Sequence, residues 1–163
     1  DLYGGNRENR LRFLREVLTE CIEAVGSDKI GLRISPFSYA EDEDEVKELY
    51  ETYTSLAEML NPLNLAYLHL SHMGDPVGVK FELWRILRSI YQGNLMLCGD
   101  FTQEKAEEVL EKNEADLIAF GRDYIANPDL AERFKNNWSL ADRDNSQWYG
   151  DGAEGYTDYP NYE

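Results

Sequence analysis

The feature that most constrains the fold is an alternation of two hydrophobic periods along the chain. Short apolar runs at 29–34, 65–70, 94–98 and 116–120 predict strands. Segments with apolar residues every three or four positions predict helices at 7–25, 44–60, 77–91 and 102–112. Asn127 and Pro128 predict the N-cap and first residue of a short last helix that ends near Phe134. Strands that alternate with helices imply parallel βαβ units. The pattern therefore indicates an α/β chain, either an open doubly wound sheet or half of a (β/α)8 barrel, and periodicity does not distinguish the two.

Composition excludes several classes of partner. The chain has 163 residues, with 32 Asp+Glu against 16 Lys+Arg and a formal net charge of −16. Binding to nucleic acid or to an anionic membrane needs a basic surface, so neither partner is expected. Two cysteines are too few for a disulfide framework, and no apolar run or signal segment predicts membrane insertion or export. We expect a cytoplasmic protein, and the absence of an initial Met indicates a processed chain or part of a larger polypeptide.

The C-terminal segment 136–163 differs from the rest. It is rich in Asp, Asn and Gly, which is typical of irregular structure. It also contains many aromatic residues, which disordered tails usually lack. These are Trp138, Trp148, Tyr149, Tyr156, Tyr159 and Tyr162. We therefore expect residues 1–135 to carry the βα units, and residues 136–163 to form an ordered, irregular cover.

Glycine-containing segments after the third and fourth expected strands form a candidate anion site. Its residues are Cys98, Gly99, Asp100, Phe101, Gly121 and Arg122. Glycine lets backbone N–H groups approach a ligand, a following helix presents its positive end, and arginine binds phosphate in a bidentate manner. In (β/α)8 barrels a phosphate often binds after the last two strands. The alternative is a pair of ordinary turns, with Arg122 paired to a carboxylate.

Arg33 is a second candidate, because it lies within the first expected strand. Alternation places it on the face opposite Ile34, near the carboxyl end. A buried cation there needs an anion or an electron-rich ligand, and the alternative is a structural ion pair. His69 and His72 have no metal-ligand spacing with Cys or carboxylates, so we expect no metal site and a hydrogen-bonded core histidine at position 69. Cys98 has no base in view, so we expect a packed thiol. The acidic run 41–45 lacks the pattern of a calcium loop and indicates a solvated helix entrance.

Taken together, motifs along the whole chain resemble the old yellow enzyme family, which includes oxophytodienoate and N-ethylmaleimide reductases. Tyr3-Gly4-Gly5 with Glu8-Asn9-Arg10 and Arg12-Phe13 is similar to its "YGGS-x-ENR-x-RF" segment. The other matching segments are 30–36 (IGLRISP), 98–102 (CGDFT), 115–130 (ADLIAFGRDYIANPDL) and 155–160 (GYTDYP). The resemblance implies a (β/α)8 TIM-type barrel of which this chain supplies strands five to eight plus the aromatic cover.

The same resemblance implies a cofactor and a reaction. The family binds FMN and uses NAD(P)H to reduce activated alkenes such as enones, nitroalkenes and maleimides. By this resemblance Arg33 faces the flavin N1/C2=O edge and stabilises the reduced cofactor. The two turns at 98–101 and 121–122 hold the FMN phosphate, again by this resemblance. It also implies that Tyr156 lies near the active-site mouth.

Two departures from the family pattern matter. Asp100 stands where the family usually has Gly or Asn, so its backbone N–H can still bind phosphate, but its carboxylate must turn away or weaken binding. The family's substrate-anchoring His and His/Asn pair and its proton-donating Tyr lie upstream of the segment that resembles 3–5. We therefore expect activity only with a complementary N-terminal half-barrel, on a separate chain or a cleaved fragment. The alternative is a non-catalytic half-barrel that binds FMN or phosphate, or only pairs with another half.

Overall fold

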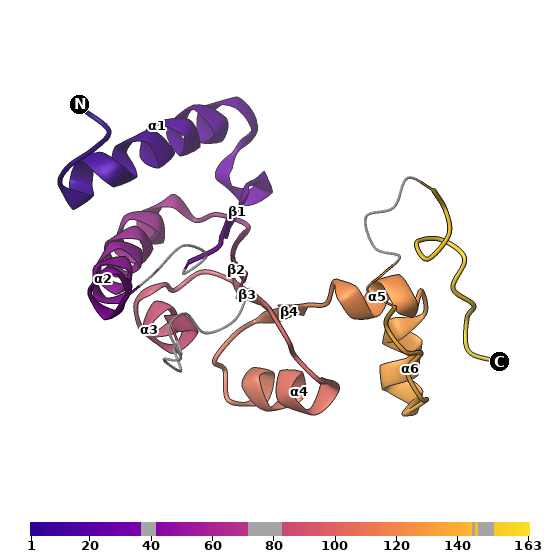
Figure 1. The fold of residues 1–163 in the computed structure, drawn as a ribbon. Coiled ribbons are helices and arrows are strands. Elements are labelled where there is room, and N and C mark those ends of the chain that lie inside the picture. The colour runs from indigo at the N-terminus through magenta and orange to yellow at the C-terminus, as the bar shows by residue number, and fades with distance from the viewer. Residues whose placement is uncertain (37–41, 72–82, 145, 147–151) are drawn as a thin grey trace. The chain divides into compact units, whose positions relative to one another are not determined.

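The computed structural model describes residues 1–36, 42–71, 83–144, 146 and 152–163. Helices and strands alternate as the sequence predicts (Figure 1). The strands are β1 (Gly31–Ile34), β2 (Tyr67–Ser71), β3 (Leu95–Cys98) and β4 (Leu117–Ala119). The helices are α1 (Arg7–Val25), α2 (Glu43–Leu60), α3 (Leu83–Ile90), α4 (Gln103–Glu111), α5 (Arg122–Ala126) and α6 (Leu130–Asn136), with 3-10 turns at Ser27–Lys29 and Asn61–Leu63. Residues 77–82 of the expected third helix lie outside the described residues, as does Glu41 of the acidic run.

Local sequence explains where the long helices begin and end. The side chains of Asn6, Asp42 and Thr102 each accept a hydrogen bond from a backbone N–H in the first turn of α1, α2 and α4. Gly26 ends α1 with a φ of 90°, a conformation that favours glycine, and its N–H donates to the carbonyl of Ile22. The acidic residues expected at the entrance of α2 occupy its first turn, where their negative charges interact favourably with the positive end of the helix dipole.

The strands form one parallel sheet in the order β1-β2-β3-β4. Leu32 is paired with Leu68 and Leu68 with Leu95, while Arg33 is paired with His69 and His69 with Met96. Since side chains alternate along each strand, this register assigns one set of residues to each face of the sheet. The predicted α/β architecture of parallel strands and helices is confirmed.

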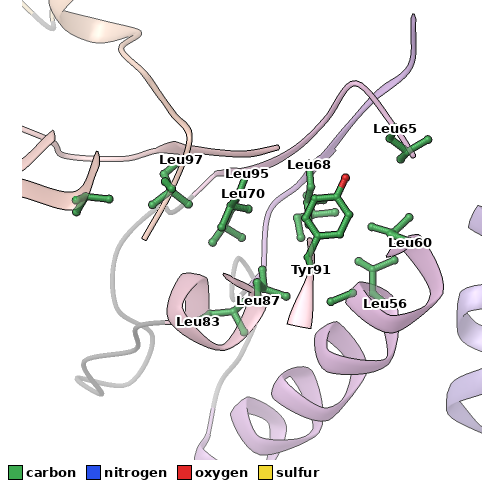
Figure 2. Packing of buried hydrophobic residues seen from close by; sticks show 14 of the residues in the cluster. Leu56, Leu60, Leu65, Leu68, Leu70, Leu83, Leu87, Tyr91, Leu95 and Leu97 are labelled. Atoms are coloured by element: carbon green, nitrogen blue, oxygen red, sulfur yellow. The ribbon is translucent and has the colours of Figure 1, made fainter. Parts of the chain in front are cut away.

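One face of the sheet carries the hydrophobic core. Leucines of β2 and β3 lie against α2 and α3 (Figure 2), and most of them are almost completely buried. The labelled core residues are Leu56, Leu60, Leu65, Leu68, Leu70, Leu83, Leu87, Tyr91, Leu95 and Leu97. Burying one such leucine stabilises the folded chain by roughly 1.5–3 kcal/mol. The helices α2 and α3 therefore cover this face of the sheet, and its apolar side chains are used for packing.

The opposite face is polar and less covered, and we call it the open face. Its residues, by register and alternation, are Gly31, Arg33, Tyr67, His69, Ser71, Met96 and Cys98. Arg33 is exposed, and His69, Met96 and Cys98 are half-buried. The Tyr67 ring lies so close to Gly31 that an added Cβ at residue 31 would be 2.2 Å from Cζ of the ring.

The prediction for the last helix is wrong in its boundaries. Instead of one helix from Asn127, the structure has α5 and α6 with Asn127 between them. The buried Asn127 side chain donates to the carbonyl of Asp123 and accepts from the N–H of Ala141. Asp129 occupies the N-cap position of α6 and bonds Arg133. Asn127 is therefore a bridge between α5 and residue 141, and Pro128 precedes the helix.

The chain divides into two compact units, residues 1–118 and 119–163. The predicted division of the chain into 1–135 and 136–163 stays a prediction. In the second unit, the described tail residues Trp138 and Tyr162 stack at 4.6 Å between ring centroids, and Arg133 lies over the Tyr162 ring. Trp148 and Tyr149 lie outside the described residues. Among the helices that the structure describes, none is long and apolar enough to span a membrane.

Candidate functional site

Arg33 is the main cation of the open face. Its Nη2 atom donates a hydrogen bond to Ser71 Oγ at 3.1 Å, from β1 to β2. Ser71 is 3% exposed, whereas Arg33 is exposed. The structural ion pair that the sequence left open is absent within the described part of the chain, because no carboxylate there lies within ion-pair distance of Arg33. The guanidinium is thus oriented by a neutral partner.

His69 lies beside Arg33 in the register of the sheet. Its Nε2 atom is buried, and no described residue forms a hydrogen bond with it. Burial lowers the pKa of His69, and the nearby charge of Arg33 lowers it further. The side chain is therefore neutral at pH 7. Among the described residues, the hydrogen bond expected of His69 does not form at Nε2, although the ring is half-buried.

The turn between β3 and α4 contains the first half of the candidate anion site. Cys98, half-buried, ends β3 as the register partner of Ser71. Gly99 and Asp100 follow, and Asp100 is exposed. The Phe101 side chain packs against the hydrophobic core, so Phe101 can offer a ligand only its backbone. The thiol of Cys98 is free, as the packed-thiol interpretation requires.

The second half of the candidate site lies at the start of the second unit. Gly121 has a φ of −106° and a ψ of −70°, which any residue can adopt, and nothing lies within 4 Å of an added Cβ. Neither backbone strain nor crowding therefore explains the glycine at this position. Arg122 begins α5 and is exposed. Because the two turns belong to different units, their union in one site stays a prediction.

Sequence reasoning missed one residue of this site. Ser71 was not singled out, although its place two residues after His69 puts it on the same face. Its bond to Arg33 joins residues 38 positions apart, so only the strand register reveals it. Tyr156, expected near a site mouth, is exposed in the second unit, and its N–H donates to the carbonyl of Ala153. Within the described residues no three His, Cys, Asp or Glu side chains gather as metal ligands.

Curated and solved relatives of this chain are reductases. Putative 12-oxophytodienoate reductase 11 of Oryza sativa subsp. japonica is 37% identical over 98% of this chain. Enoate reductase 1 of Kluyveromyces lactis is 34% identical over the whole chain. A structure of morphinone reductase in complex with tetrahydroNAD superimposes with a TM-score of 0.86, at 37% identity over 100% of this chain. The chain spans only part of these proteins, covering 45%, 45% and 44% of them respectively.

The fold therefore matches part of the barrel of these enzymes. The sequence profile described as the NADH:flavin oxidoreductase / NADH oxidase family matches residues 1–141, which is most of the chain. By this match, and by relatives that extend over its full length, the chain belongs to the old yellow enzyme, or NADH:flavin oxidoreductase, family.

Proposed function

We propose that this chain is the FMN-binding, C-terminal half of an NAD(P)H-dependent ene-reductase that reduces activated C=C bonds. The observation that carries the proposal is the guanidinium of Arg33, exposed on the open face and without a carboxylate partner among the described residues. If a second half covers this face, the buried cation will be costly unless an anionic or electron-rich ligand meets it. Membership of a flavin enzyme family supplies the ligand class.

The residues of this chain fit the cofactor. Arg33 supplies a cation on the open face, and His69 Nε2, to which no described residue forms a hydrogen bond, supplies a polar atom beside it. The space beside Gly121 leaves its backbone accessible to a phosphate oxygen, and Arg122 next to it provides a second cation. Gly99 and Asp100 contribute backbone N–H groups before α4. Asp100 is exposed, so its carboxylate has room to turn away from a phosphate.

The residues of the chain have distinct tasks in this proposal. FMN, when bound, carries the hydride from NAD(P)H to the alkene. Arg33 binds the cofactor and favours the negative charge that reduction brings. Residues 98–101 with Gly121 and Arg122 anchor the phosphate, and Tyr156 lies near the mouth of the active site. The groups that hold the alkene and give the final proton come from the complementary half.

The sheet supports the need for a second half. β1 and β4 are the outer strands of the order β1-β2-β3-β4, so each has an edge that no described strand pairs. Such edges seek partners. The inward side chains of a barrel are also packed in layers supplied by all its strands. The relatives are longer than this chain, which supports a complementary N-terminal half-barrel as the partner.

The test mixes two fragments. One is the 163-residue chain, and the other is the part of the Kluyveromyces lactis enoate reductase 1 that this chain does not match. With FMN, NADPH and cyclohexenone, we expect NADPH oxidation by the mixture and none by the chain alone. Turnover by the chain alone would contradict the need for a second half. A mixture that shows no flavin absorption bands after gel filtration would contradict FMN binding and favour a half-barrel that only pairs.

A further inference from the structure

We propose that Ser71 is a positioning residue for Arg33: its hydroxyl fixes the direction of the guanidinium on the open face without neutralising the charge. This inference rests on the proposed function, in which that charge meets the flavin. Ser71 itself does not need to touch the cofactor, because it acts through Arg33.

The geometry supports a fixed direction. The donor is Arg33 Nη2 at one end of a long side chain, and the acceptor is Ser71 Oγ at 3.1 Å. Ser71 ends β2 and is 3% exposed, so its hydroxyl is held by the sheet. An arginine side chain loses much rotational freedom when one end is fixed. Because the bond already restricts the Arg33 side chain, a ligand that binds the guanidinium loses less free energy to side-chain ordering.

The chemistry of the partner matters as much as its position. A carboxylate at this distance would orient the guanidinium equally well but would cancel its charge. A hydroxyl orients it and leaves the full positive charge for a ligand. The neighbouring His69 adds no second charge, since burial and Arg33 itself keep its pKa low. Arg33, Ser71 and His69 thus form a cluster with one cation and no anion.

A double-mutant cycle tests the proposal on the reconstituted mixture described above. The variants are Ser71→Ala, Arg33→Ala and the double variant, with Ser71→Thr to restore the hydroxyl. Ser89→Ala is the matched control, because Ser89 donates to the carbonyl of Ile86 within α3. The measurements are the FMN dissociation constant, from flavin fluorescence, and the midpoint potential of the bound flavin.

We expect Ser71→Ala to weaken FMN by about twofold to tenfold, the cost of ordering one freed side chain. It should lower the midpoint potential in the same direction as Arg33→Ala but by less. Ser71→Thr should restore both values, Ser89→Ala should change neither, and Ser71→Ala should have no further effect once Arg33 is absent. An equal effect of Ser71→Ala with and without Arg33 would overturn the proposal.

A measurement without flavin separates this inference from the proposed function. Nitrogen-15 relaxation of the Arg33 side chain in the 163-residue chain reports whether the guanidinium is held. We expect an ordered Arg33 Nε–H that becomes mobile in Ser71→Ala and is ordered again in Ser71→Thr. Equal mobility in all three would refute the role of Ser71. If Arg33 is ordered but the mixture binds no FMN, the proposed function is refuted, whereas the role of Ser71 in orienting Arg33 is retained.

Discussion

Arg133 joins the C-terminal segment to α6 through four different groups. Its Nε donates to Asp129 Oδ1 at 2.6 Å, its Nη1 to the carbonyl of Ser139 at 2.8 Å and its Nη2 to the carbonyl of Pro160 at 3.3 Å. The guanidinium also lies 5.4 Å from the centre of the Tyr162 ring. Arg133 is only 5% exposed, so these contacts are screened little by water.

Arg133→Met keeps the apolar stem and removes every one of these contacts. Loss of one partner from a buried ion pair destabilises a fold by about 3–5 kcal/mol, because the other charge stays behind. Asp129 keeps the N–H of Tyr162 as a donor, and its side chain is 15% exposed, so water relieves part of the cost. We therefore expect a loss near the lower limit, about 3 kcal/mol, confined to the second unit.

Amide hydrogen exchange measures this loss at the bonds concerned. The N–H of Tyr162 bonds Asp129, and the N–H of Trp138 bonds the carbonyl of Arg133, so both should exchange faster in Arg133→Met. The control is Lys135→Met, since Lys135 is 3.9 Å from Glu132 and both side chains are exposed, at 73% and 60%. Its effect should stay below about 0.5 kcal/mol. Equal exchange in the two variants would refute the assignment of Arg133 as the anchor of the C-terminal segment.

Arg122→Ala should weaken FMN about 10- to 100-fold in the reconstituted mixture, by analogy with the roughly 1.5–3 kcal/mol of a hydrogen bond to a charged group. Arg143→Ala removes the same charge nearby, where it pairs with Asp123, and should leave the FMN titration unchanged. Tyr91→Phe should raise the free energy of unfolding by about 1 kcal/mol in urea, because its buried hydroxyl has no partner among the described residues; a loss of stability would show a bond to that hydroxyl. The N–H of Tyr162 and the Arg133 side chain lower the pKa of Asp129 below its ordinary value of 3.8. The ionised Asp129 carboxylate therefore stabilises the second unit above pH 3.8, and this contribution is lost as the pH falls through the lower pKa of the folded state. Exchange at the Tyr162 amide should accelerate only below about pH 4. Asp129→Asn should abolish that acceleration.

The sequence predicted those parts of the fold that local patterns determine. The first helix was predicted at 7–25 and found at Arg7–Val25, because its stripe, its Asn6 cap and its Gly26 end lie within one segment. The faces of β1 followed from alternation alone. The end of the chain was harder, since Asn127 looks like a cap but its side chain accepts from Ala141, 14 positions later. Bonds of that span depend on tertiary structure, and local signals do not contain them.

The same limit applies to the candidate site. Arg33 and the glycine turns could be singled out because their residue types and strand positions carry the signal. Ser71 could not, because its importance lies in a bond across two strands. The sequence also left open a structural ion pair for Arg33, and only the three-dimensional neighbourhood of the described residues shows that none forms there.

The Tyr67 ring packs against Gly31, so the two ends of the open face differ. Gly31 and Tyr67 are the first residues of β1 and β2 and are paired, so the ring fills the amino-terminal end of the face at these two strands. Arg33 lies two residues further along β1, and Ser71 and Cys98 are the last residues of β2 and β3. The Tyr67 ring thus covers this face of the sheet where β1 and β2 begin. A molecule bound at the Arg33 guanidinium would have this ring on the side where the strands begin, and Ser71 and Cys98 on the side where they end.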